Sequence, residues 1–174
     1  MPRYPRCIPW LVVAICLILA GQAMAVAPEI RDEGKFFSPE AIKKANEQIR
    51  ELYVKYGKDL LIETFPSVPA DQRDKVMAMN GKEREEYFHQ LAVTRATQQV
   101  VKGIYIRITR QPKFLNVEST PDSHELFDSE FKTQLRQTLL KGFRANEFDD
   151  GLAHALKTVQ ERLAKGASGQ EPLK

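Results

Sequence analysis

The sequence predicts an α/β domain, a single three-layer α/β/α sandwich whose small mixed sheet has helices on both faces. Two short apolar regions, 59–65 and 103–118, are typical of a strand and of a strand pair joined by a polar turn. The segments around them carry apolar residues at helical spacing. A chain of 174 residues, 43% of them hydrophobic, is large enough to bury one core.

The first 25 residues are typical of a secretory signal peptide. Arg3 and Arg6 precede an apolar run over residues 8–20, and the small residues Ala23 and Ala25 suit a signal peptidase. The alternative, a retained membrane anchor, would need about 20 apolar residues, so we favour cleavage after Ala25. We therefore expect an exported protein, periplasmic or extracellular, without a retained transmembrane helix and with its folded domain at 26–165.

Cleavage would also remove both cysteines, Cys7 and Cys16. The mature chain would then have no disulfide, no thiol nucleophile and no thiolate metal site. The formal net charge of +3 would fall to +1 without Arg3 and Arg6. Because the remaining cations are interspersed with Asp and Glu, we expect no nucleic-acid partner.

The first half of the domain is predicted to contain one strand with helices before and after it. Ser38 is suited to cap a helix that Gly57 ends. The strand at 59–65 is followed by a short helix at 70–79 and a longer one at 82–101. The apolar residues expected to face the core are Ile42, Ala45, Ile49, Leu52, Tyr53 and Tyr56 in the first helix, and Tyr87, Phe88, Leu91, Ala92, Ala96 and Val100 in the last.

A hairpin is expected next. Ile104, Ile106 and Ile108 alternate with Tyr105 and Arg107, which indicates a half-buried strand. The preceding helices form a crossover, which favours parallel pairing of this strand with the first one. The chain then turns and returns over 114–118 as an antiparallel partner.

Two helices, at 129–143 and 147–163, complete the domain. Asn146 is suited to cap the second of them. The polar residues 166–174 have no periodicity, so we expect a disordered tail.

These connections bring several polar residues to one rim of the sheet, at the carboxyl ends of the parallel strands. Open α/β sheets bind their ligands at this edge. The residues expected there are Asp32, Ser67, Lys113, Asn146, Asp149 and Asp150.

Three of these residues, Asp32, Asp149 and Asp150, could hold calcium or magnesium, which prefer carboxylate oxygens. The alternative is that the last two complement a helix N-terminus and the first caps a turn. Asp150 and His154 share a helix face, and an exposed helix pair is the simpler interpretation. The sequence contains no G-x-S-x-G motif and no Gly-rich phosphate loop.

Four segments, in order along the chain, resemble the TPM domain family. They are IRDEGKFFS at 30–38, YGKDLLIETFPSV at 56–68, GIYIRI at 103–108 and FRANEFDDGL at 143–152. The resemblance implies an α/β/α sandwich in exported or membrane-facing proteins. Members include a thylakoid-lumen protein linked to photosystem II repair, to which acid phosphatase activity and calcium binding are attributed, and a nematode receptor-modulating protein.

The resemblance leaves two functions open. The first is a non-catalytic binding or maintenance module for membrane or envelope protein complexes. The second is a weak acid phosphatase assisted by a divalent metal. Lys102 stands where the family often has an acidic or amide residue, and Glu118 and Ser119 stand where it often has Gly, so the sequence favours the first.

Overall fold

Four strands form one sheet in the computed structural model, which describes residues 27–169. The strands lie in the order β1-β2-β3-β4. Their bounds are Arg31–Asp32 for β1, Asp59–Phe65 for β2, Gly103–Thr109 for β3 and Phe114–Ser119 for β4. The β1–β2 and β2–β3 pairs are parallel and the β3–β4 pair is antiparallel, so the sheet is mixed as predicted.

Five α-helices surround the sheet in the described part of the chain. They are α2 (Pro39–Tyr56), α3 (Arg73–Ala78), α4 (Gly81–Gln98), α5 (Ser129–Ala145) and α6 (Phe148–Gly169), with 3-10 turns η1 at Ala70–Gln72 and η2 at Pro121–Ser123. Helix α2 starts as expected, because the Ser38 hydroxyl accepts a hydrogen bond from the Ala41 N–H, and Gly57 ends it in the left-handed conformation. Within residues 27–169, no helix is both long and apolar enough to span a membrane.

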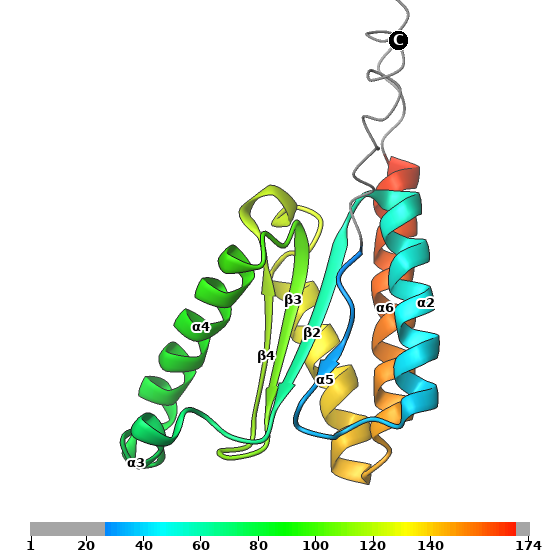
Figure 1. The fold of residues 1–174 in the computed structure, drawn as a ribbon. Coiled ribbons are helices and arrows are strands. Elements are labelled where there is room, and N and C mark those ends of the chain that lie inside the picture. The colour runs from blue at the N-terminus through cyan, green and yellow to red at the C-terminus, as the bar shows by residue number, and fades with distance from the viewer. Residues whose placement is uncertain (1–26, 170–174) are drawn as a thin grey trace, which may run out of the picture.

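The helices form unequal layers on the two faces of the sheet (Figure 1). Helices α2, α5 and α6 cover one face, and α4 covers the other, which confirms the three-layer sandwich. Successive side chains of a strand point to opposite faces. Ile104 and Ile106 of β3 therefore join the large core under three helices, whereas Tyr105 packs with Leu61 and Ala92 beneath α4.

Strand β3 lies in the middle of this arrangement, and all seven of its residues are buried. The prediction of a half-buried strand was wrong, because helices cover both faces. Gly103 is required at its start: an added Cβ would lie 2.1 Å from the backbone oxygen of Asp59 on β2. The apposition of the two parallel strands leaves no space there for a side chain.

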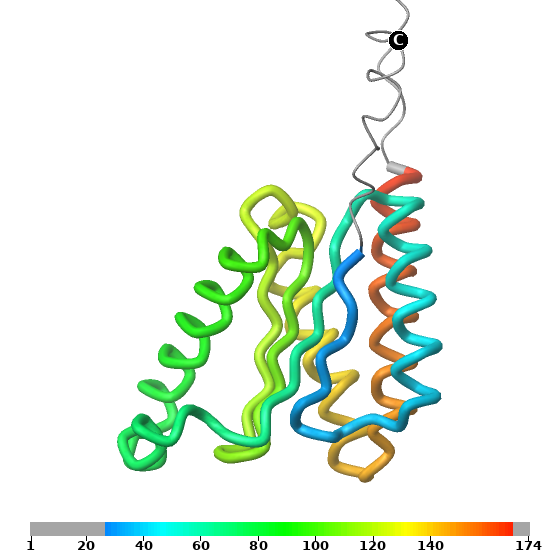
Figure 2. Tube along the Cα trace, in the orientation of Figure 1, coloured from blue at the N-terminus to red at the C-terminus, as the bar shows by residue number. Residues whose placement is uncertain are grey.

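The N-terminal segment and three details of the helices differ from the sequence-based expectation. Figure 2 shows the first described residues running beside β2, where Arg31 and Asp32 add a parallel strand that the sequence did not predict. Val100 follows the end of α4 and is 71% exposed, so it does not contribute to the buried face. Asn146 ends α5 in the left-handed conformation instead of capping α6. Helix α6 continues to Gly169, into the segment expected to be a tail.

The predicted signal peptide, residues 1–25, lies outside the described residues, as do residues 170–174 of the expected tail.

Candidate functional site

A pocket of about 460 Å³ opens at the carboxyl end of β3. The β3–β4 turn, the second half of α5, the start of α6 and the loop before α2 contribute its walls. We call it the strand-end pocket. Its lining residues are Phe36, Ile108, Thr109, Arg110, Lys113, Phe114, Leu115, Arg136, Leu140, Phe143, Arg144, Asn146 and Phe148.

The floor of the strand-end pocket is aromatic. The rings of Phe36 and Phe143 are stacked with their centroids 5.5 Å apart. Phe148 meets both edge-on, at 5.6 Å from Phe36 and 5.1 Å from Phe143. These rings come from the loop before α2, from α5 and from α6, so the floor is formed only when the three segments pack together.

The rim of the pocket is cationic. Arg110 is fixed in place, because its guanidinium donates to the carbonyl oxygens of Gly34 and Lys35 and lies 4.1 Å from the centre of the Phe36 ring. Lys113 and Arg144 are exposed at the opening. Among the described residues that line the pocket, none is Asp or Glu. The pocket therefore favours an anionic ligand.

Thr109, the last residue of β3, also lines the pocket. The residue is 2% exposed, and its hydroxyl has no hydrogen-bond partner within the described part of the chain. A buried hydroxyl without a partner is unfavourable. Thr109 pairs with Phe114 of β4 and lies on the same face of β3 as Tyr105, so this hydroxyl belongs to the face under α4.

Two of the predicted metal ligands hold the loop that leads into α2. The Asp32 carboxylate accepts hydrogen bonds from the N–H groups of Phe36 and Phe37, at 3.0 and 2.9 Å, and from the Thr64 hydroxyl. Asp149 accepts the Ser38 N–H at 2.9 Å. Both carboxylates therefore have a structural role in placing the Phe36 ring in the pocket floor.

Of the other four residues predicted at the rim, two line the strand-end pocket and two lie elsewhere. Lys113 and Asn146 line the strand-end pocket, as expected. Asp150 is exposed and lies with His154 in a different groove, between α5 and α6. The Ser67 hydroxyl donates to the Val68 carbonyl, outside the pocket. Across residues 27–169, no three His, Cys, Asp or Glu residues are grouped so that they could hold a metal ion.

A buried charge cluster lies on the opposite side of the sheet, under α4. Glu63 is 1% exposed, and its carboxylate accepts hydrogen bonds from Arg95 at 2.7 and 2.8 Å, from Arg31 at 2.8 Å and from the Tyr105 hydroxyl at 2.9 Å. Burial alone would raise the pKa of Glu63, but these donors together lower it. Burial and the nearby Glu63 charge raise the pKa of Tyr105. Each charge in the cluster is paired, so it stabilises the fold without presenting a free group.

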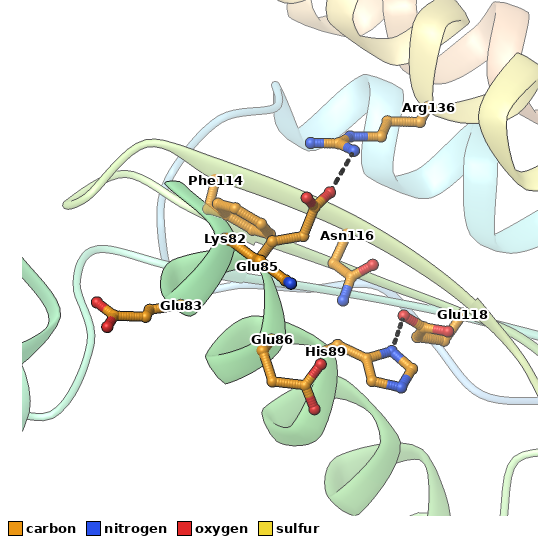
Figure 3. Close-up of a pocket in the computed structure, with 9 residues that line it drawn as sticks. All are labelled: Lys82, Glu83, Glu85, Glu86, His89, Phe114, Asn116, Glu118 and Arg136. Carbon is orange, nitrogen blue, oxygen red and sulfur yellow. Dashed lines mark hydrogen bonds and ion pairs between the residues drawn. The ribbon is translucent and has the colours of Figure 1, made fainter. Parts of the chain in front are cut away.

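A second concave region, the α4–β4 groove, has a volume of about 570 Å³ and is shown in Figure 3. In it, the His89 ring nitrogen Nδ1 lies 2.7 Å from Glu118 Oε1, and Glu85 reaches Arg136 at 3.5 Å. Four of its nine lining residues are glutamates, and two of these contact His89 and Arg136 across the groove. We therefore regard the strand-end pocket as the stronger candidate site.

Sequence reasoning missed Phe36, Arg110, Arg136 and Arg144 as site residues. A signal was present for two of them. Arg136 lies in the helix predicted at 129–143, and Arg144 follows its predicted end, eight residues after Arg136. This spacing puts both on one side if the helix continues. Phe36 and Arg110 carried no such pattern, because their places depend on loops.

The comparisons with known proteins agree with this architecture. The model of the TPM domain matches residues 30–162. A solution structure of the N-terminal domain of a P. gingivalis protein is similar, with a TM-score of 0.62 and 14% identity over 83% of this chain and 87% of that one.

The BA42 protein of the psychrophilic bacterium Bizionia argentinensis is similar with a TM-score of 0.52 and 18% identity, over 75% of this chain and 83% of that one. No curated protein matches the sequence. The two structural likenesses show a shared fold, and the family match extends over most of the chain. The chain belongs to the TPM domain family.

Proposed function

We propose that this protein is an exported, non-catalytic binding module that recognises an anionic partner at the strand-end pocket. The observation that carries the proposal is the lining of that pocket: four cationic side chains surround an aromatic floor, and no carboxylate lines it among the described residues. Positive charge in a concave, partly apolar site attracts anions and fixes their orientation. We place the partner among membrane or envelope proteins, in keeping with the leader-like N-terminus.

A metal-assisted phosphatase is the second candidate, with Asp32, Asp149 and Asp150 holding calcium or magnesium. Lys113 favours it, because this cation in the pocket could offset the charge of a phosphate. The hydrogen bonds of Asp32 and Asp149 favour the non-catalytic binding module over the phosphatase, because these carboxylates already accept backbone N–H groups. Taking up a metal would compete with these contacts in the loop before α2.

A turnover assay separates the two functions. We expect no hydrolysis of a phosphomonoester above background, with or without millimolar calcium or magnesium, and no metal-induced rise in the thermal midpoint. The matched variants are Asp150→Asn, which changes an exposed carboxylate, and Asp149→Asn, which keeps an acceptor for the Ser38 N–H. Metal-dependent turnover that either substitution abolishes would overturn the binding proposal.

Export is checked separately by the mass of the protein recovered from cells. Cleavage after Ala25 leaves Val26 as the first residue. An intact N-terminus held in the membrane would contradict this part of the proposal.

A further inference from the structure

Helix α5 presents a stripe of alternating cationic and apolar side chains to the strand-end pocket. Arg136, Leu140 and Arg144 follow one another at intervals of four residues, and all three line the pocket. With a rise of about 1.5 Å per residue, neighbouring members of the stripe are about 6 Å apart along the helix axis. The pocket wall is therefore cationic, apolar and cationic again over about 12 Å.

The two arginines start from different parts of α5. The guanidinium of Arg136 is directed toward β4, where it lies 5.7 Å from the centre of the Phe114 ring and 3.5 Å from a Glu85 carboxylate oxygen. Arg144 is exposed near the other end of the helix. A charged hydrogen bond needs its heavy atoms about 2.8 Å apart, and the two arginines start about 12 Å apart along the helix axis. Two separate anionic groups therefore suit the stripe better than one.

We propose, resting on the proposed function, that the strand-end pocket binds an extended acidic segment of a partner protein with the pattern acidic–x–apolar–x–acidic. Alternate side chains of an extended chain point to the same side and are about 6.6 Å apart. This spacing matches the stripe, so the two carboxylates meet Arg136 and Arg144 while the apolar side chain packs on Leu140 and the Phe143 ring.

The remaining wall of the pocket is also cationic. Arg110 and Lys113 add positive charge on the side facing α5. The Arg136–Glu85 contact is long, and its side chains are 39% and 67% exposed, so a better-placed carboxylate can replace Glu85.

The experiment titrates the purified protein with the blocked peptide acetyl-Ser-Glu-Gly-Phe-Gly-Glu-Ser-amide, followed by NMR chemical shifts. We expect saturable shifts at Thr109 and Leu140 and weaker binding as the salt concentration rises. Arg136→Gln and Arg144→Gln should each weaken binding on the order of tenfold. Lys141→Gln, which removes an exposed α5 cation that lines the groove with α6, should leave the affinity unchanged.

Two control peptides test the pattern itself. Replacing both glutamates by glutamine, or the phenylalanine by glycine, should weaken binding at least as much as either protein variant. Equal binding of these peptides, or affinity unaffected by Arg136→Gln and Arg144→Gln in folded variants, overturns the inference.

Inorganic phosphate distinguishes failure of the ligand class from failure of the proposed function. If phosphate shifts the pocket resonances while the acidic peptide does not, the peptide inference is wrong and the pocket remains an anion site. If neither ligand affects the pocket, the inference and the proposed binding function both fail. The thermal midpoint of each variant verifies that the substitutions leave the fold intact.

Discussion

Glu63 is the most constrained charged residue beneath α4. It lies within β2, and donors reach it from β1, from α4 and from β3, so one carboxylate links four elements. Loss of its charge would leave the Arg95 guanidinium without its carboxylate partner. A broken buried pair is destabilising because the remaining group has lost both water and its partner.

Glu63→Gln should lower the free energy of unfolding by about 2 kcal/mol at neutral pH. Because the native pKa is lowered, Glu63 contributes this stability above the ordinary glutamate pKa of about 4.3. The contribution fades as the pH falls through the native pKa, so the difference between wild type and variant should shrink in acid. Urea unfolding at several pH values measures it. Glu161→Gln, at an exposed site, should change stability by less than about 0.5 kcal/mol; a similar loss there would contradict the assignment.

For single residues, the sequence predicted which types lie near the sheet end better than it predicted what each side chain contacts. The Asp32 and Asp149 carboxylates accept hydrogen bonds from backbone N–H groups of the loop at 36–38, and for Asp32 this agrees with the alternative of a turn cap. Asparagine is common both at the start and just after the end of a helix. For Asn146, only the left-handed backbone shows that it ends one. Such roles depend on tertiary neighbours, which local patterns do not specify.

Among the elements, α5 and α6 make the closest helix contact. They are joined by a short turn at Asn146, and glycines face each other where they meet. A Cβ on Gly142 would lie 2.6 Å from the Gly151 Cα and 2.8 Å from the Glu147 carbonyl oxygen. Both obstacles are backbone atoms, so the helices would have to separate to accept a side chain.

Gly142→Ala should therefore destabilise the protein by about 1–3 kcal/mol, measured by urea unfolding. Gly81→Ala is the matched control, because Gly81 starts α4 and an added Cβ there would meet nothing within 4 Å. That substitution should be neutral or stabilising by up to about 1 kcal/mol. Equal effects at the two positions would show that helix separation is not the cause.

Elements with a complete local signal were predicted closely. The start of α2 has a cap and its end a glycine, and β2 is bounded by Gly57 and Pro66. Strand β1 was missed because two residues, Arg31 and Asp32, are too few to show a period, and their pairing with β2 creates the strand. Helix α6 exceeds its expected length because the six residues after Leu163 are small or polar and carry no apolar period.

For the whole molecule, the order and direction of the strands followed from the crossover and the hairpin. This topology also placed Lys113 and Asn146 at the strand-end pocket. It did not place Asp150 or Ser67 there, because their distances from the sheet depend on how α6 and the η1 region pack. The cationic rim could not be predicted for the same reason, because the order of the strands does not determine where the loop residues lie.

The unequal covering of the sheet has a consequence for motion. The face under α2, α5 and α6 shares one large apolar core, whereas α4 buries only Phe88, Ala92 and Ala96 in two small clusters. Opening free energies are lowest where few apolar contacts hold a segment. The backbone amides of α4 should therefore exchange with deuterium well before those of α5 and α6, which hydrogen-exchange mass spectrometry can follow. Equal protection of these helices would show that the sandwich opens only as a unit. Earlier exchange of α4 would show that this helix opens locally and exposes Glu63 while the rest of the domain stays folded.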